Sequence, residues 1–175
     1  MKKALIVGLN NYPGCKLEWC DNDAISMKEL IETNGDGSPN FDVISIIDSC
    51  TKHDLRIAIE KLFADDADVA LLYFSGHGAD LDGGYLCTTD FSGADYGVRM
   101  TDVLEWANKS RCKNKVIILD CCFAAKMGTS ILLNNNSVLG EGVTIIAASQ
   151  SWQTSAENAS IQHGVFTELL IQGLK

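Results

Sequence analysis

Two short apolar segments of the chain end in residues that can do covalent chemistry. The segment VALLYFSGHGAD, at positions 69–80, places His77 between two glycines just after its apolar run. The segment KVIILDCCFAA, at positions 115–125, places Cys121 and Cys122 in the same relation to its own run. Short apolar runs bounded by polar residues and glycine are typical of buried parallel strands, and open α/β sheets bind ligands at the carboxyl ends of such strands. We therefore expect an imidazole and a thiol to meet at one end of a sheet.

A thiol beside an imidazole is the pair that nucleophilic catalysis by cysteine needs. The thiolate is the reactive form of cysteine, and a neighbouring His77 can promote it and later protonate a leaving amine. The glycines allow close approach to a substrate carbonyl, so the amide N–H groups of Gly78 and Cys122 are the expected donors to an oxyanion. The alternative is that both cysteines are small buried hydrophobic residues, the commoner state of free cysteine. Because successive side chains of a strand face opposite ways, we expect one of the two to be structural.

The composition is that of an ordinary globular protein with an acidic balance. The 175 residues include 14 basic and 23 acidic side chains, which gives a formal net charge of −9. This balance opposes nucleic-acid binding, which needs clustered lysine and arginine. Seven cysteines without a CxxC pair, and a start (MKKALIVGLN) without a signal-peptide pattern, predict reduced thiols and a cytoplasmic location. No apolar run approaches the ~20 residues that span a bilayer, so we expect no membrane insertion.

Apolar strand-like segments alternate with amphipathic helical segments along the whole chain. We expect strands at 3–9, 41–47, 69–74, 115–119 and 143–148, and a short hairpin arm at 85–88. We expect helices at 21–33, 51–63, 101–108 and 164–174, with Thr51 and Thr101 as N-caps. Strands alternating with helices indicate an α/β protein built as a three-layer α/β/α sandwich, here a single domain over 1–175.

The motifs around the histidine and the cysteines resemble those of the caspase and metacaspase peptidases. FSGHG at 74–78 and LDCC at 119–122 are similar to the two catalytic motifs, and matches in WCDNDAISM, QTSAE and GVFTELL extend the resemblance over nearly the whole chain. The resemblance implies a caspase-like fold with a mostly parallel sheet, of the minimal prokaryotic type. It assigns the nucleophile to Cys122, with Cys121 in the position before it, and the catalytic histidine to His77.

The resemblance also divides the chain as caspase-like domains are divided. Residues 1–123 correspond to a large subunit, 124–141 to a linker and 142–175 to a small subunit. Lys126 is the only basic residue of the linker and so the expected self-cleavage point of a zymogen. The family usually has a sixth strand after the last helix, so we expect a truncated domain or a regulatory partner that covers the C-terminal sheet edge.

A primary specificity pocket follows from the same resemblance. Metacaspases line this pocket with two aspartates, which correspond to Asp23 and Asp120 here. Two carboxylates in one concave site attract a guanidinium or ammonium group, so we expect cleavage of protein or peptide substrates after arginine or lysine. Ser149 and Trp152 follow the fifth strand and are expected to wall the cleft. The alternatives are that Asp23 is a helix-start residue and Asp120 a strand-end turn residue.

Other polar groups carry weaker signals. We expect no cofactor and no metal; the alternative is a calcium site, for which Asp80, Asp82, Asp90 and Asp95 are the candidate ligands. The two other histidines have no cysteine motif beside them, so we interpret His53 and His163 as structural.

The sequence also bears on functions of other classes. The main alternative is a catalytically silent caspase-like binding module. A nucleotide-binding domain lacks any GxGxxG or P-loop spacing, and a cysteine phosphatase would need an arginine in the loop after Cys122. The leading hypothesis is thus a cysteine-type endopeptidase that cleaves after arginine or lysine through a Cys122–His77 dyad.

Overall fold

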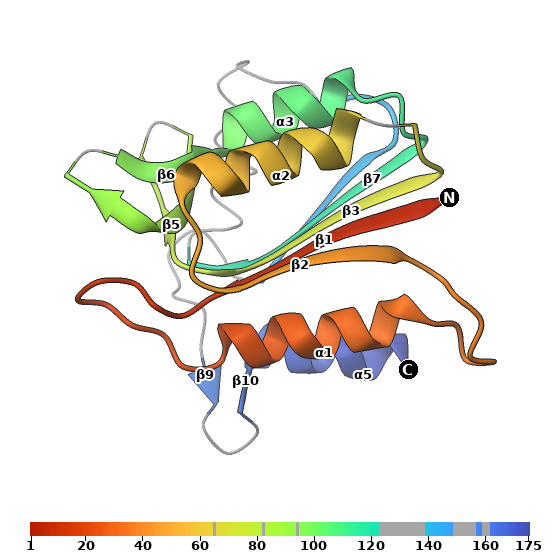
Figure 1. Cartoon of the computed structure of the whole chain (residues 1–175), viewed down its shortest axis with the longest axis horizontal. Coiled ribbons are helices and arrows are strands. Elements are labelled where there is room, and N and C mark those ends of the chain that lie inside the picture. Colours follow the sequence, from red (N-terminus) through yellow and green to blue (C-terminus); the bar gives the residue numbers. More distant parts are fainter. Residues whose placement is uncertain (65, 82, 94, 123–138, 149–156, 159–161) are drawn as a thin grey trace.

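A five-stranded, wholly parallel sheet forms the centre of the molecule in the computed structural model (Figure 1). The structure describes residues 1–64, 66–81, 83–93, 95–122, 139–148, 157–158 and 162–175. The strand order is β2-β1-β3-β7-β8. The bounds are β1 (Lys2–Leu9), β2 (Asp42–Asp48), β3 (Val69–Gly76), β7 (Asn114–Cys121) and β8 (Val143–Ala147).

Helices cover both faces of this sheet. Helices α1 (Cys20–Glu32) and α5 (Val165–Leu174) lie on one face, and α2 (Lys52–Ala64) and α3 (Met100–Lys109) lie on the other (Figure 1). Each face has its own core: one cluster contains Ile6, Met27 and Ile171, and the other contains Leu5, Ile59 and Val103. The three layers confirm the α/β class and the caspase-like sandwich expected from the sequence.

The order of the strands indicates where along the sheet a ligand can bind. The chain runs outward from β1 to β2 and then returns to β3, β7 and β8 on the other side of β1. The connections therefore diverge between β1 and β3, the position where open α/β sheets leave a crevice at the carboxyl ends of their strands. The loop at 10–19 leaves β1 there, and His77 follows β3 at the same end.

The described residues also form two small antiparallel sheets. The first joins β4 (Gly78–Ala79), β5 (Tyr85–Ser92) and β6 (Asp95–Arg99), and it projects beside the carboxyl ends of the central strands (Figure 1). The second pairs β9 (Glu157–Asn158) with β10 (His163–Gly164), directly before α5. Among the helices that the structure describes, none is long and apolar enough to cross a membrane.

Most expected elements are confirmed, and the differences concern their ends. β3 and β7 each run two residues further than expected, to Gly76 and Cys121, because the pairing of the two strands continues to that point. Thr51 caps α2, since its hydroxyl accepts a hydrogen bond from the Asp54 N–H at 3.1 Å. The expectation for Thr101 is wrong: α3 begins at Met100, after an N-cap at Arg99. The hairpin of β5 and β6 is also longer than the arm expected at 85–88.

Candidate active site

The expected histidine and cysteine follow two neighbouring strands at the same level. Gly76 of β3 lies opposite Cys121 of β7 in the parallel register, so His77 and Cys122 are the next residues on each strand. Adjacent strands lie about 4.8 Å apart, so the two residues leave the sheet from neighbouring positions. The Cys121 side chain is fully buried, whereas Cys122 is half-buried. The structure thus brings the two motifs together, with one cysteine in the core and one at the surface of the site.

Burial divides the seven cysteines by their ability to react. All except Cys15 and Cys122 are buried. Burial is the first cause that raises the pKa of Cys121 well above its usual value, with the charge of Asp120 as the next. The pKa of Cys87 is raised to about 12, again mainly by burial and further by the neighbouring thiols of Cys15 and Cys122. A buried, uncharged thiol is a poor nucleophile, so Cys122 is the thiol of this region that is suited to attack.

The imidazole of His77 is held by the loop that follows β1. Its Nε2 lies 2.7 Å from the carbonyl oxygen of Cys15. Because a carbonyl oxygen only accepts hydrogen bonds, Nε2 must carry the proton, and Nδ1 of the neutral ring is left as the proton acceptor. The ring of Tyr12 packs edge-on against the imidazole, with 4.6 Å between the ring centroids. His77 is therefore oriented from two sides.

The backbone N–H of Gly78 points away from its neighbouring strand. Cys87 N–H donates to the His77 carbonyl at 3.0 Å, which makes His77 and Cys87 a hydrogen-bonded pair of the antiparallel ladder. Gly78 and Leu86 form the next pair, and such pairs alternate with pairs whose N–H groups face outward. The Gly78 N–H therefore faces away from β5, as a donor to a substrate oxygen must.

The two expected pocket aspartates meet beneath this site. Asp23 lies in the first turn of α1 and Asp120 near the end of β7, and they are 2% and 4% exposed. A Cβ atom at Gly164 would lie 2.7 Å from Asp120 Oδ2 and 3.0 Å from Asp23 Oδ2. The bare backbone of Gly164 thus fits between the two carboxylates, and its N–H donates to Asp23 Oδ1 at 3.1 Å. The structure brings the acids together but leaves them almost wholly covered.

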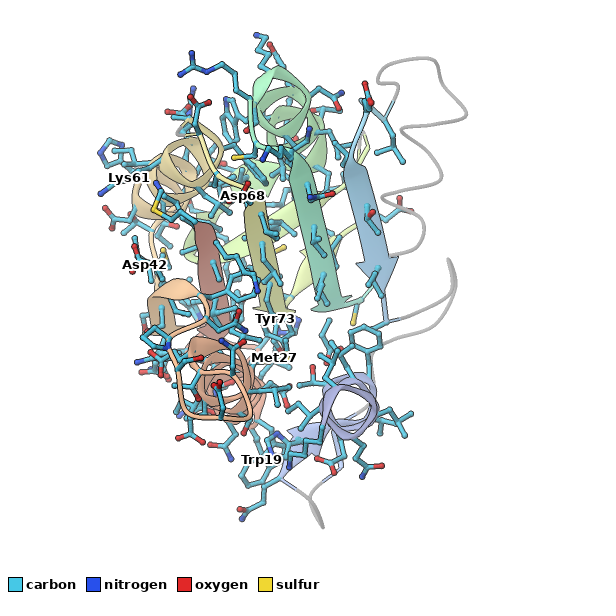
Figure 2. The ribbon with its side chains drawn as sticks, turned by 90° about the vertical axis from the view of Figure 1, so that its right-hand side faces the viewer. Trp19, Met27, Asp42, Lys61, Asp68 and Tyr73 are labelled. Atoms are coloured by element: carbon cyan, nitrogen blue, oxygen red, sulfur yellow. The ribbon has the colours of Figure 1, made fainter. Side chains whose placement is uncertain are left out.

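Several hydroxyl groups lie around the acid pair. The sequence analysis did not predict them as residues of this site. Ser75 Oγ donates to Asp23 Oδ2 at 3.2 Å, and Thr167 Oγ1 donates to Asp120 Oδ2 at 2.7 Å. The Tyr73 hydroxyl lies 2.5 Å from Thr167 Oγ1, and Tyr73 belongs to the buried cluster between the sheet and α1 that also contains Met27 (Figure 2). Ser75 belongs to the motif FSGHG and Thr167 to GVFTELL, and membership of these motifs is the sequence signal that could have identified them.

His163, which we interpreted from the sequence as structural, contacts the acid pair. Its Nδ1 lies 2.9 Å from Asp23 Oδ1. Burial raises the pKa of Asp23 from 3.8 to about 6; the hydrogen bond from His163 opposes this rise, and the charge of Asp120 adds to it. No signal in the sequence pointed to the contact, because 140 positions separate the two residues.

The remaining expected site residues are the two cleft-wall residues and the candidate calcium ligands. Ser149 and Trp152 lie outside the described residues. Among the candidate calcium ligands, Asp90 accepts hydrogen bonds from the Lys52 N–H and the Thr88 hydroxyl, and Asp95 pairs with the Lys52 ammonium. Within the part of the chain that the structure describes, no three histidine, cysteine, aspartate or glutamate side chains gather as a metal site.

Comparison with known proteins agrees with this geometry. A family model described as the caspase domain matches residues 1–175. The chain belongs to the caspase-domain family. This is a family of cysteine peptidases, and the chain is also similar to Metacaspase-4 of Arabidopsis thaliana, with 38% identity over 89 residues. That match covers 46% of this chain and 21% of the length of the plant protein.

Proposed function

We propose that this caspase domain is a cysteine endopeptidase that cleaves after arginine or lysine through Cys122 and His77. The observation that supports the proposal is the register of β3 and β7: Gly76 pairs with Cys121, and His77 and Cys122 are the next residues of the chain after this pair. Cys122 is half-buried, whereas Cys121 is sealed in the core. A family of cysteine peptidases supplies the reaction class. The substrates are accordingly proteins or peptides.

The reaction follows from the roles that the geometry offers. The Cys122 sulfur attacks the scissile carbonyl carbon while its proton passes to His77 Nδ1, the ring nitrogen that does not donate to Cys15. The N–H groups of Gly78 and Cys122 stabilise the oxyanion that forms. When the C–N bond breaks, His77 returns the proton to the leaving amine, and water then hydrolyses the thioester with His77 as the base.

The preference for a basic residue rests on the acid pair. Among the described residues, Asp23 and Asp120 are the buried carboxylates near the carboxyl ends of the central strands, and a guanidinium can bind both through paired hydrogen bonds. In the structure their oxygens are bound by Gly164, Thr167 and Ser75. A substrate cation therefore has to replace part of this cover, so binding is coupled to a shift of the segment that carries Gly164.

The experiment is cleavage of fluorogenic peptides that end in arginine, lysine or aspartate, with and without calcium. We expect turnover of the arginine and lysine peptides that falls by roughly 10³-fold or more in Cys122→Ala and in His77→Ala, as for other catalytic nucleophiles and bases. Cys121→Ala is the matched control and should keep most of the turnover, because Cys121 is buried away from the substrate.

Each outcome bears on a different part of the proposal. Turnover that survives Cys122→Ala but not Cys121→Ala would reverse the assignment of the nucleophile. Cleavage confined to the aspartate peptide would overturn the role of the acid pair and leave the peptidase intact. No turnover of any peptide in either buffer would favour the silent binding module.

A further inference from the structure

The Tyr12 side chain lies between His77 and β5. Its side chain is 3% exposed. Its hydroxyl accepts a hydrogen bond from the His77 backbone N–H at 3.1 Å and donates one to the Cys87 carbonyl at 3.1 Å. A single hydroxyl thus joins the backbone of His77, which lies between β3 and β4, to the backbone of Cys87 in β5.

The two backbone groups are those that an ordinary ladder would pair directly. In an antiparallel sheet, the two residues of a hydrogen-bonded pair exchange both of their N–H···O bonds. Cys87 N–H donates to the His77 carbonyl at 3.0 Å, but the return bond from His77 to Cys87 is replaced by the Tyr12 hydroxyl. The hydroxyl is therefore inserted into the ladder at the His77–Cys87 pair, and so acts on the backbone of the residue that carries the imidazole.

The same loop fixes the imidazole ring itself. The Tyr12 ring packs edge-on against it, and the Cys15 carbonyl accepts from its Nε2. Cys15 N–H in turn donates to the Tyr12 carbonyl at 3.3 Å, so the two contacts belong to one turn of the chain. Backbone, ring face and ring nitrogen of His77 are all set by residues 12–15.

We propose that Tyr12 is a positioning residue whose hydroxyl, inserted into the β4–β5 ladder, sets the backbone of His77 so that the imidazole faces Cys122. The inference rests on the proposed pairing of these two residues. Without the hydroxyl, the His77 N–H and the Cys87 carbonyl lose their partner, and closing the ladder directly would draw His77 toward β5 and away from Cys122. The thiol of Cys122 would then lose the base that promotes its ionisation.

The test measures the rate at which iodoacetamide alkylates Cys122, a readout that needs no substrate. It uses the Cys15→Ser background, which removes the exposed Cys15 thiol and keeps its carbonyl; the other five cysteines are buried. We expect Tyr12→Phe to lower the rate near neutral pH by about three- to tenfold, the effect of losing one hydrogen bond. In alkaline buffer above the ordinary thiol pKa of about 8.5 the rates should converge, because the thiol then ionises without help.

Two further variants separate this inference from the proposed function. Tyr85→Phe is the matched control: it also removes a buried tyrosine hydroxyl, but one that accepts from Arg99 at 2.9 Å, and it should leave the rate unchanged. His77→Ala should lower the rate at least as much as Tyr12→Phe. An unchanged rate in His77→Ala would overturn the proposed pairing itself. A fall in His77→Ala but not in Tyr12→Phe, or an equal fall in Tyr85→Phe, would overturn the role of Tyr12 alone.

Gly76→Ala disturbs the hydroxyl without removing it. A Cβ atom at Gly76 would lie 2.5 Å from the Tyr12 hydroxyl oxygen, so the hydroxyl must move. We expect Gly76→Ala to slow alkylation in the same pH-dependent way, and to cost less in the Tyr12→Phe background than in the parent, because part of the clash is then gone. Strictly additive effects of the two changes would contradict the contact on which the inference rests.

Discussion

At the scale of single residues, the surroundings of Asp23 change its acid–base chemistry. Asp23 faces Asp120 from β7, Ser75 from β3, and Gly164 and His163 from the segment before α5. Its pKa of about 6 lies above its ordinary value of 3.8 mainly because of burial. The folded state therefore holds the proton more tightly than the unfolded state, so this stabilising contribution is complete below pH 3.8 and is lost as the pH rises through about 6. An ionised Asp23 carboxylate is thus obtained at some cost in stability.

The binding of a cation should follow this titration. We expect the inhibition constant of agmatine, a small guanidinium compound, to fall as the pH rises through about 6, because Asp23 gains its charge there. His163→Gln should move that transition to higher pH, since the hydrogen bond and charge of His163 lower the pKa of Asp23. Asp23→Asn is the control and should give a flat profile over this range. A transition that persists in Asp23→Asn would assign it to another group.

At the scale of elements, the contact between β1 and α1 positions the acidic side of the site. Gly8 allows α1 to lie directly on the strand: a Cβ atom there would lie 2.1 Å from the Cys20 carbonyl oxygen and 2.6 Å from Ala24 Cβ. Cys20 is the first residue of α1, and Asp23 lies one turn further along. The loop between the two elements carries Tyr12 and Cys15. Close packing at Gly8 therefore positions both the loop that contacts His77 and the first turn of α1, which carries Asp23.

Gly8→Ala should test this packing. We expect it to lower the free energy of unfolding by roughly 1–3 kcal/mol, as overpacking does, and to weaken agmatine binding because α1 must move. Gly35→Ala is the matched control, since no atom lies within 4 Å of a Cβ at Gly35, and it should change neither quantity appreciably. The two variants are compared by urea unfolding and by agmatine inhibition. Equal stability of both variants would show that the strand and helix can separate without cost.

At the scale of the whole molecule, the C-terminal part is joined to the rest through the sheet and the acid pair. β8 adds to β7 as the edge strand, and Ile171 of α5 packs in the same core as Ile118. Thr167, which is fully buried, binds both Asp120 and Tyr73. These contacts connect residues on either side of the linker expected at 124–141, so they do not depend on the linker being continuous.

A cut in the linker should therefore leave one folded molecule. We expect that, after cleavage at a protease recognition sequence inserted near Lys126, the two fragments elute together in size-exclusion chromatography and separate only in denaturant. Thr167→Val removes the buried hydroxyl from two partners, and we expect it to lower the urea midpoint of the cut protein more than that of the intact one, because the intact chain keeps the fragments at high local concentration. Fragments that separate without denaturant would contradict the prediction.

The sequence by itself determined the parts of this protein that local patterns encode. The apolar runs at 69–74 and 115–119, the Thr51 cap and the motifs around His77 and Cys122 all depend on near neighbours in the chain, so the α/β class and the two catalytic candidates could be predicted. The expectation that one of Cys121 and Cys122 is structural came from the alternation of side chains along a strand. The burial of Cys121 in the structure agrees with it.

Only the tertiary structure decided which distant residues surround those candidates. The contact of Tyr12 with His77 spans 65 positions and that of His163 with Asp23 spans 140, and neither pair has a spacing that a local pattern could reveal. The pKa of Asp23 and the cover of the acid pair likewise arise from burial beneath α5, a consequence of packing. Sequence patterns report which face of an element is apolar, whereas the partners across the core depend on how the elements assemble.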